Sequence, residues 1–172
     1  KDQGGLLTID RVRTLVPVIQ QNIKGLPLEI HSHCNTGLAT LCYLEAMKLG
    51  VNTFHVAVPP LAEGPSLPSA LNILHNARHL GYTVKADEEA LKAMSAHFQM
   101  IAEKEHRPAG APMEHDVYYY QHQVPGGMVT TLKRQLTEVK MEHRLEDILE
   151  EVVRVRQELG YPIMVTPFSQ FV

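Results

Sequence analysis

The sequence predicts an α/β protein with parallel strands, followed by a purely helical segment. Two short runs, residues 26–30 and 51–58, are nearly continuous in apolar residues, as expected for strands buried on both faces. Helix-like stripes precede, separate and follow them, so that helix–strand units repeat about every 25 residues. This alternation is typical of a parallel sheet or barrel.

Three helices are predicted around these strands. The first covers about residues 9–24, where Thr8 or Asp10 is a suitable N-cap and apolar residues recur at intervals of three and four. The second covers about residues 37–49, and the third residues 69–80. A glycine follows the last two, as is common at helix C-termini.

The pattern changes after residue 84. A long helix is predicted over residues 87–106, and two more over 127–140 and 145–160, with no strand between them. We therefore expect two domains, an α/β part at residues 1–84 and a helical subdomain at residues 85–172.

Composition narrows the function classes. The chain has 172 residues, 44% hydrophobic and 20% charged, with a net charge of -3, which gives no basic surface for nucleic acid. Its apolar runs are too short to cross a bilayer, and no charged leader opens the chain. Cys34 and Cys42 do not form a C-x-x-C pair, so we expect free thiols and a cytoplasmic location.

Two histidines stand at the end of the first predicted strand, in the segment "LEIHSHCNTG". His31 and His33 are two apart, so an extended chain points both side chains the same way, at the strand end where parallel α/β folds bind ligands. Two converging imidazoles suit a divalent transition metal. The alternative is that one histidine closes the strand and the other faces solvent.

A third ligand is conceivable at the first residue. Lys1 precedes a Gly-Gly loop and a helix, as if the chain were cut just after a strand one unit earlier. A protonated amine has no lone pair for a metal, whereas a lysine carbamylated by carbon dioxide carries a carboxylate. Without that modification Lys1 is an ordinary surface lysine.

Four segments resemble motifs of the biotin-dependent carboxyltransferases. In family order they are "KDQGGLL", "HSHCNTG", "YYYQHQVPGGMVTTLKRQL" and "VTPFSQFV". They resemble K-D-M-A-G-L-L, H-x-H-x-T-[ST]-G, Y-x-H-Q-M-P-G-G-x-x-[ST]-N-L and V-T-P-x-S-Q-x-V. The family includes the carboxyltransferase domain of pyruvate carboxylase, the alpha subunit of oxaloacetate decarboxylase and the pyruvate-specific transcarboxylase subunit.

The resemblance implies a fold. It is the C-terminal part of a (β/α)8 TIM barrel followed by a helical funnel subdomain. The strands that end at Lys1, His33 and Val58 would be the sixth, seventh and eighth. The N-terminal half of the barrel, which carries an Asp metal ligand and a substrate-binding Arg and Gln in the family, would be a missing partner of this chain.

The resemblance also implies a metal site. Its ion, zinc, cobalt or manganese, would be held by His31, His33 and a carbamylated Lys1, which is also the candidate catalytic residue. Asn35 and Thr36 would orient the ligands, although a plain turn-forming role is as good an interpretation.

The implied reaction moves a carboxyl group between carboxybiotin and pyruvate, making or consuming oxaloacetate. Biotin would come on another domain or subunit, because Lys48 of "EAMKLG" lies near the end of a predicted helix and not on the hairpin tip that biotin attachment requires. A homo-oligomer is also expected from the family.

Two departures from the family pattern keep alternatives open. Pro65 stands where the family has a proton-shuttling Thr, unless Ser66 or Ser69 replaces it, and Val124 replaces a Met. The alternatives are a biotin-independent lyase or aldolase of the same barrel superfamily, and a non-catalytic assembly subunit. The block "HQVPGG" favours the carboxyltransferase.

The remaining residues of interest have structural interpretations. His55, in the second predicted strand, is expected to be a packed or hydrogen-bonded interior residue. Gly126 and Gly127 are expected to form a tight turn, which His122 and Gln123 would pack against the barrel mouth.

Overall fold

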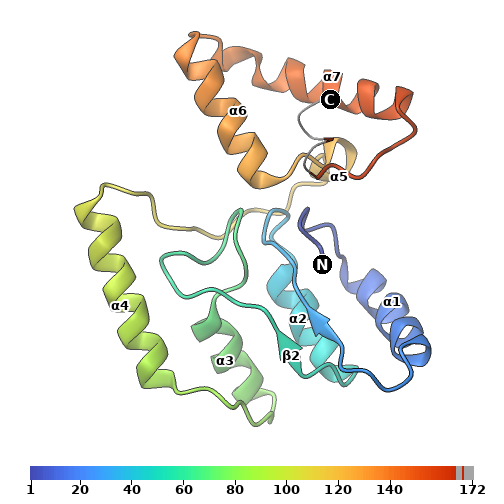
Figure 1. Cartoon of the computed structure of the whole chain (residues 1–172), viewed down its shortest axis with the longest axis vertical. Coiled ribbons are helices and arrows are strands. Elements are labelled where there is room, and N and C mark those ends of the chain that lie inside the picture. The colour runs from blue at the N-terminus through green and yellow to red at the C-terminus, as the bar shows by residue number, and fades with distance from the viewer. Residues whose placement is uncertain (166–167, 169–172) are drawn as a thin grey trace. The chain divides into compact units, whose positions relative to one another are not determined.

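A computed structural model describes residues 1–165 and 168 (Figure 1). The chain divides into two compact units, Lys1–His115 and Asp116–Val172. The compact units thus separate 31 residues beyond the expected boundary at 84, because 115 − 84 = 31. The reason is that the long helix after residue 84 packs against the helix before it. The assignment of residues 1–84 to a barrel stays a prediction.

The first unit alternates helices and strands, as predicted. In chain order its elements are α1 (Ile9–Asn22), β1 (Glu29–Ile30), α2 (Ala39–Lys48), β2 (Thr53–Phe54), α3 (Ala70–His79) and α4 (Glu88–Lys104). Helices that follow one another in sequence pack together: α1 with α2, α2 with α3, and α3 with α4 (Figure 1). The two strands are parallel, which confirms the α/β class.

The regular strands are shorter than the predicted runs, but the extended backbone continues beyond them. Beyond the paired residues of β1 and β2, His55 N–H donates to the carbonyl of Ile30 at 2.9 Å. On the other edge of β1, Asp2 N–H donates to the carbonyl of His31 at 2.7 Å, and His33 N–H donates to that of Asp2 at 3.0 Å. Three parallel extended segments, at residues 1–2, 29–33 and 53–55, therefore lie next to one another.

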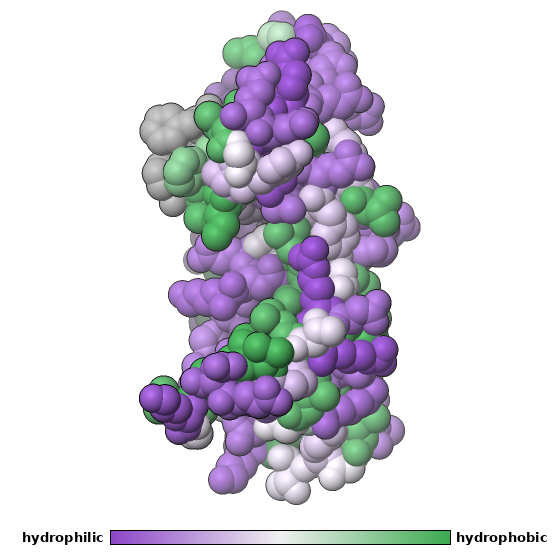
Figure 2. All heavy atoms as spheres, turned by 90° about the vertical axis from the view of Figure 1, so that its right-hand side faces the viewer, coloured by the Kyte–Doolittle hydropathy of each residue, from purple (hydrophilic) through white to green (hydrophobic). Residues whose placement is uncertain are grey.

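The core of this unit lies between the strands and the first three helices. Tyr43 and Ala46 of α2 are fully buried there, together with Val12 and Val16 of α1. The predicted stripe on α1 is therefore confirmed at these positions, whereas Leu15 is 47% exposed. Figure 2 shows the face that carries α1, where apolar side chains gather among polar ones.

Both cysteines are free, as predicted, and both are buried. Burial raises the pKa of Cys42 to about 12 and also raises the pKa of Cys34, where the nearby Glu63 adds to the effect. The thiolate is the reactive form, and burial disfavours it at both cysteines.

The second unit is helical over its described residues. It contains α5 (Tyr119–His122), α6 (Gly126–Glu138), a 3-10 helix (Glu142–Arg144) and α7 (Leu145–Glu158). Val124, Val152 and Met164 form its small core. The expected turn at Gly126–Gly127 is wrong: both glycines form the first residues of α6, because Pro125 at the N-cap presets the chain for helix entry.

None of the helices among the described residues is long and apolar enough to cross a membrane.

Candidate metal centre

The backbone at the ends of the strands is fixed by one buried hydroxyl. Tyr43 of α2 is fully buried, and its hydroxyl accepts from the Ser32 N–H at 2.9 Å. The same hydroxyl donates to the carbonyl of His55 at 2.8 Å. Tyr43 thus holds the end of β1, which carries His31 and His33, at a fixed distance from the end of β2.

The two histidines that follow β1 come together. Nε2 of His31 lies 3.2 Å from Nε2 of His33, and both side chains are partly buried. Two nitrogens bound to zinc at 2.0–2.1 Å with a tetrahedral angle would be about 3.3 Å apart. The pair therefore fits two ligands of one transition-metal ion.

His33 is oriented by the loop before α3. Its Nδ1 lies 2.6 Å from the carbonyl oxygen of Pro65. Because a carbonyl only accepts, Nδ1 carries the proton and Nε2 keeps its lone pair. The proline that replaces the family's hydroxyl residue therefore acts here through its backbone.

His31 contacts a histidine that sequence reasoning did not place in the site. Its Nδ1 lies 3.1 Å from Nδ1 of His55, whose Nε2 lies 3.1 Å from a carboxylate oxygen of Glu29. His55 is hydrogen-bonded as expected, but it is partly exposed and not an interior residue. The available signal was the parallel register, which sets His31 and His55 at matching positions of neighbouring strands.

The pKa of His31 is lowered. Burial has the largest effect, and the positive charges of His33, His55 and Lys1 add to it. Neutral imidazole is the form that binds metal ions.

Lys1 lies next to this pair. Its neighbour Asp2 bridges to Ser32 in parallel register, and the positive charge of Lys1 contributes to the lowered pKa of His31. The Asp2 carboxylate accepts from the Ser32 hydroxyl at 2.7 Å and from two backbone N–H groups of the following loop. This carboxylate therefore fixes the chain direction at Lys1.

Asn35 and Thr36 hold the loop that follows Lys1. The Asn35 amide donates to the carbonyls of Gln3 and Gly4, each at 3.2 Å, and the Thr36 hydroxyl donates to that of Gly5 at 2.6 Å. Both side chains are buried. These contacts reach the loop and not the imidazole rings, so any effect on the ligands passes through the backbone.

The two serines near Pro65 in sequence, Ser66 and Ser69, make different contacts. The Ser69 side chain caps α3 by accepting from the Asn72 N–H at 3.3 Å. Ser66 contributes its carbonyl to the N–H of Cys34 at 2.8 Å.

The "HQVPGG" block forms a buried polar cluster within the second unit. His122 is 3% exposed, and its Nδ1 accepts from the Val124 N–H at 3.0 Å. Gln123 accepts from the guanidinium of Arg156, which is itself buried. Burial lowers the pKa of His122, an effect that Asp116 partly opposes.

Within the described residues, no three His, Cys, Asp or Glu side chains form a cluster that could hold a metal ion. The described site thus consists of two imidazoles with Lys1 beside them.

Comparison with known proteins identifies the chain's relatives. A family model described as a conserved carboxylase domain matches residues 119–172. A pyruvate carboxylase subunit of Methanocaldococcus jannaschii is 36% identical over the whole chain, which covers 30% of that protein. The methylmalonyl-CoA carboxyltransferase 5S subunit of Propionibacterium freudenreichii is 27% identical, and the chain covers 34% of it.

The fold matches a solved carboxyl transferase domain. The structure of this domain from Rhizobium etli pyruvate carboxylase, with pyruvate and biocytin, superimposes with a TM-score of 0.87 at 24% identity. The match covers 99% of this chain and 28% of that one. The chain thus spans about a third of the length of these proteins. The resemblance to pyruvate carboxylases and biotin-dependent carboxyltransferases that the sequence motifs predict is therefore confirmed.

Proposed function

We propose that this chain provides metal ligands for carboxyl transfer between carboxybiotin and pyruvate or oxaloacetate. The observation that carries the proposal is the approach of Nε2 of His31 to Nε2 of His33, at 3.2 Å, beside the segment that begins with Lys1. The relatives support the reaction class, since their names include pyruvate carboxylase and a carboxyltransferase.

The three parallel segments would be the last strands of a (β/α)8 barrel. Barrel enzymes place their active sites at the carboxyl ends of the strands, which is where His31 and His33 lie. In this proposal residues 1–84 belong to the barrel and residues 85–172 to a helical subdomain. An N-terminal half of the barrel completes the sheet.

The residues present fit a divalent metal, with zinc, cobalt and manganese as candidates. His31 and His33 would supply two imidazole nitrogens and a carbamylated Lys1 an oxygen, and a further ligand would come from the N-terminal half. When bound, such an ion polarises the keto oxygen of the substrate as a Lewis acid.

The chain's own residues set the position of these ligands. The carbonyl of Pro65 holds the His33 ring with Nε2 toward His31. Asp2, Asn35 and Thr36 hold the loop after Lys1, so that a carbamate on Lys1 would be presented at the same strand ends.

Biotin would arrive on another domain or subunit. Lys48 is the last residue of α2, and its amine is ion-paired with Glu45 at 3.0 Å, which does not suit a biotin attachment site. A homo-oligomer and a cytoplasmic location belong to the same proposal.

Pro65 favours a second candidate. The residue has no hydroxyl that could carry a proton between biotin and substrate, and the Ser69 side chain is already engaged as a helix cap. A biotin-independent lyase or aldolase on the same barrel, or a non-catalytic assembly subunit, would not need that proton transfer.

A biotin-dependence assay separates these functions. The chain is combined with the N-terminal half of the barrel and loaded with zinc, and oxaloacetate decarboxylation is measured with and without free biotin. A carboxyltransferase shows biotin-stimulated turnover that falls more than about 100-fold in His33→Ala, since loss of a ligand exceeds the 10–100-fold cost of losing an orienting partner. His79→Ala, on the exposed end of α3, is the matched control and retains activity.

Two other outcomes contradict the carboxyltransferase. Oxaloacetate turnover at the same rate with and without biotin would indicate the lyase. Bound zinc without any turnover would indicate an assembly subunit.

A further inference from the structure

A hydrogen-bonded series of side chains lies behind His31 and runs along the strand pair. We propose that Glu29 and His55 form a relay that fixes His31 as the Nδ1–H tautomer and so presents the Nε2 lone pair of His31 to a metal ion. Glu29 and His55 are thus positioning residues, in an inference that rests on the proposed function. Neither lies in the H-x-H segment, and neither would touch the ion.

The direction of the relay follows from the carboxylate. A carboxylate of Glu29 can only accept, so the nitrogen 3.1 Å from it, Nε2 of His55, must carry a proton. A neutral imidazole carries one proton, so Nδ1 of His55 is an acceptor.

The contact between His55 and His31 then sets the tautomer of His31. Its Nδ1 faces the acceptor nitrogen of His55 at 3.1 Å and must therefore donate. Nε2 of His31 is then left with its lone pair, directed at Nε2 of His33, 3.2 Å away. The carbonyl of Pro65 imposes the same state on His33 from the other side. Two lone pairs facing each other at this distance suit a cation bound between them.

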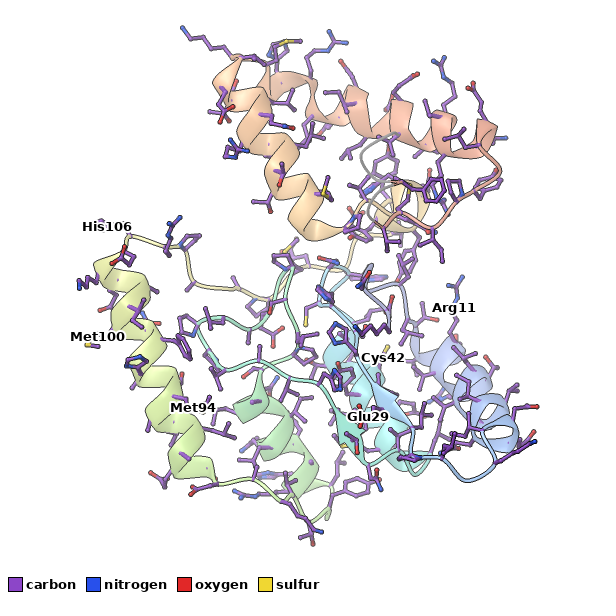
Figure 3. The ribbon with its side chains drawn as sticks, in the orientation of Figure 1. Arg11, Glu29, Cys42, Met94, Met100 and His106 are labelled. Carbon is purple, nitrogen blue, oxygen red and sulfur yellow. The ribbon has the colours of Figure 1, made fainter. Side chains whose placement is uncertain are left out.

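The strand register builds the relay. Glu29 pairs with Thr53 and Ile30 with Phe54, so the next position along the ladder sets His31 opposite His55. Glu29 and His31 are two apart and point to the same face of β1, and the ring of His55 contacts both. The two rings meet edge to face, with centroids 5.3 Å apart. Figure 3 labels Glu29 beside the strand pair.

The experiment reads the tautomer and the metal affinity separately. Protein labelled with 15N-histidine is examined by long-range 1H–15N NMR at pH 8 without metal, and zinc affinity is measured by competition with a chelator. Wild type should show His31 with its proton on Nδ1. His55→Phe keeps a ring but removes both nitrogens, so His31 should gain the Nε2–H form and zinc affinity should fall about 10–100-fold.

Conservative variants test whether the hydrogen bond itself matters. His55→Gln restores an acceptor for Nδ1 of His31 and should recover most of the affinity. Glu29→Leu frees the tautomer of His55 and should give an intermediate loss. His79→Phe, the same substitution on the exposed end of α3, should leave both measurements at wild-type values.

The outcomes separate a failure of the proposed relay from a failure of the proposed metal site. An Nε2–H tautomer of His31 in metal-free wild type, or unchanged zinc affinity in His55→Phe, would overturn the relay. Absence of zinc binding by wild type with His31 still in the Nδ1–H form would overturn the metal site and leave the relay standing as a description of the imidazoles.

Discussion

At the scale of single residues, the H-x-H spacing was enough to predict that two imidazoles converge, because extended backbone returns side chains to one face every second residue. The contact of His31 with His55 could not be found in the same way, since 24 residues separate them and only the strand register joins them. The contact of Pro65 with His33 could not be predicted from the sequence for a different reason. It acts through a backbone carbonyl, which every residue type possesses.

Tyr43 is the residue whose loss should disturb the strand ends most. Tyr43→Phe keeps the ring but leaves the N–H of Ser32 and the carbonyl of His55 without their partner in a fully buried place. We expect the free energy of unfolding to fall by about 1–3 kcal/mol, measured by urea denaturation. Tyr82→Phe, at a side chain that is 38% exposed, serves as the control and should be within about 0.5 kcal/mol of wild type. Equal stability of the two variants would show that the buried hydroxyl does not hold the strands.

At the scale of elements, the six longer helices were predicted to within a few residues because apolar periodicity and caps are local signals, whereas the four-residue α5 was not predicted. Thr8, one of the two N-cap candidates of the first helix, caps α1, and Asp87 caps α4. The strands were overestimated, since an apolar run records burial, whereas a strand needs a hydrogen-bonded neighbour. Only residues 29–30 and 53–54 form a regular ladder within the described chain.

The loop after Lys1 depends on one glycine. Gly5 has φ +64°, and a Cβ there would lie 2.5 Å from the carbonyl oxygen of His33. Gly5→Ala should therefore combine left-handed strain with a backbone clash, and lower both stability and zinc affinity. Gly25→Ala is the matched control, because its φ is +81° but no atom lies within 4 Å of the added Cβ.

Urea denaturation and a zinc titration check this prediction. In the control, Gly25→Ala, left-handed strain alone should lower the free energy of unfolding by about 1–3 kcal/mol, and the affinity for zinc should not change. If the two variants behave alike, the approach of the loop to His33 is not tight.

At the scale of the whole molecule, the two compact units have different origins in the sequence. The first was predicted from alternation of helix and strand, and the second from helices without strands. Helix α4, which is predicted to begin the helical part, packs against α3 within the first compact unit. The contacts of Arg156 with Gln121 and Gln123 could not be predicted from apolar periodicity, because they join polar groups more than 30 residues apart.

Stability of the second unit should depend on pH through His122. Its folded pKa is depressed by burial, so as pH falls below the unfolded value of about 6.5 the unfolded state binds the proton first. The contribution is complete above pH 6.5 and is lost as pH falls toward the folded pKa, by about 1.4 kcal/mol per unit of depression. Urea unfolding at pH 7.5 and 5.5 should show a larger loss for wild type than for His122→Gln, and equal losses would contradict the burial of a neutral ring.

The proposed function depends on His31 and His33 sharing one metal ion at the ends of parallel strands. Anomalous diffraction at the zinc absorption edge tests it most directly, on crystals of the protein grown with zinc. The structure predicts one anomalous peak between the two Nε2 atoms, about 2.0–2.1 Å from each. A map without that peak, in which the two rings point apart, would contradict the account.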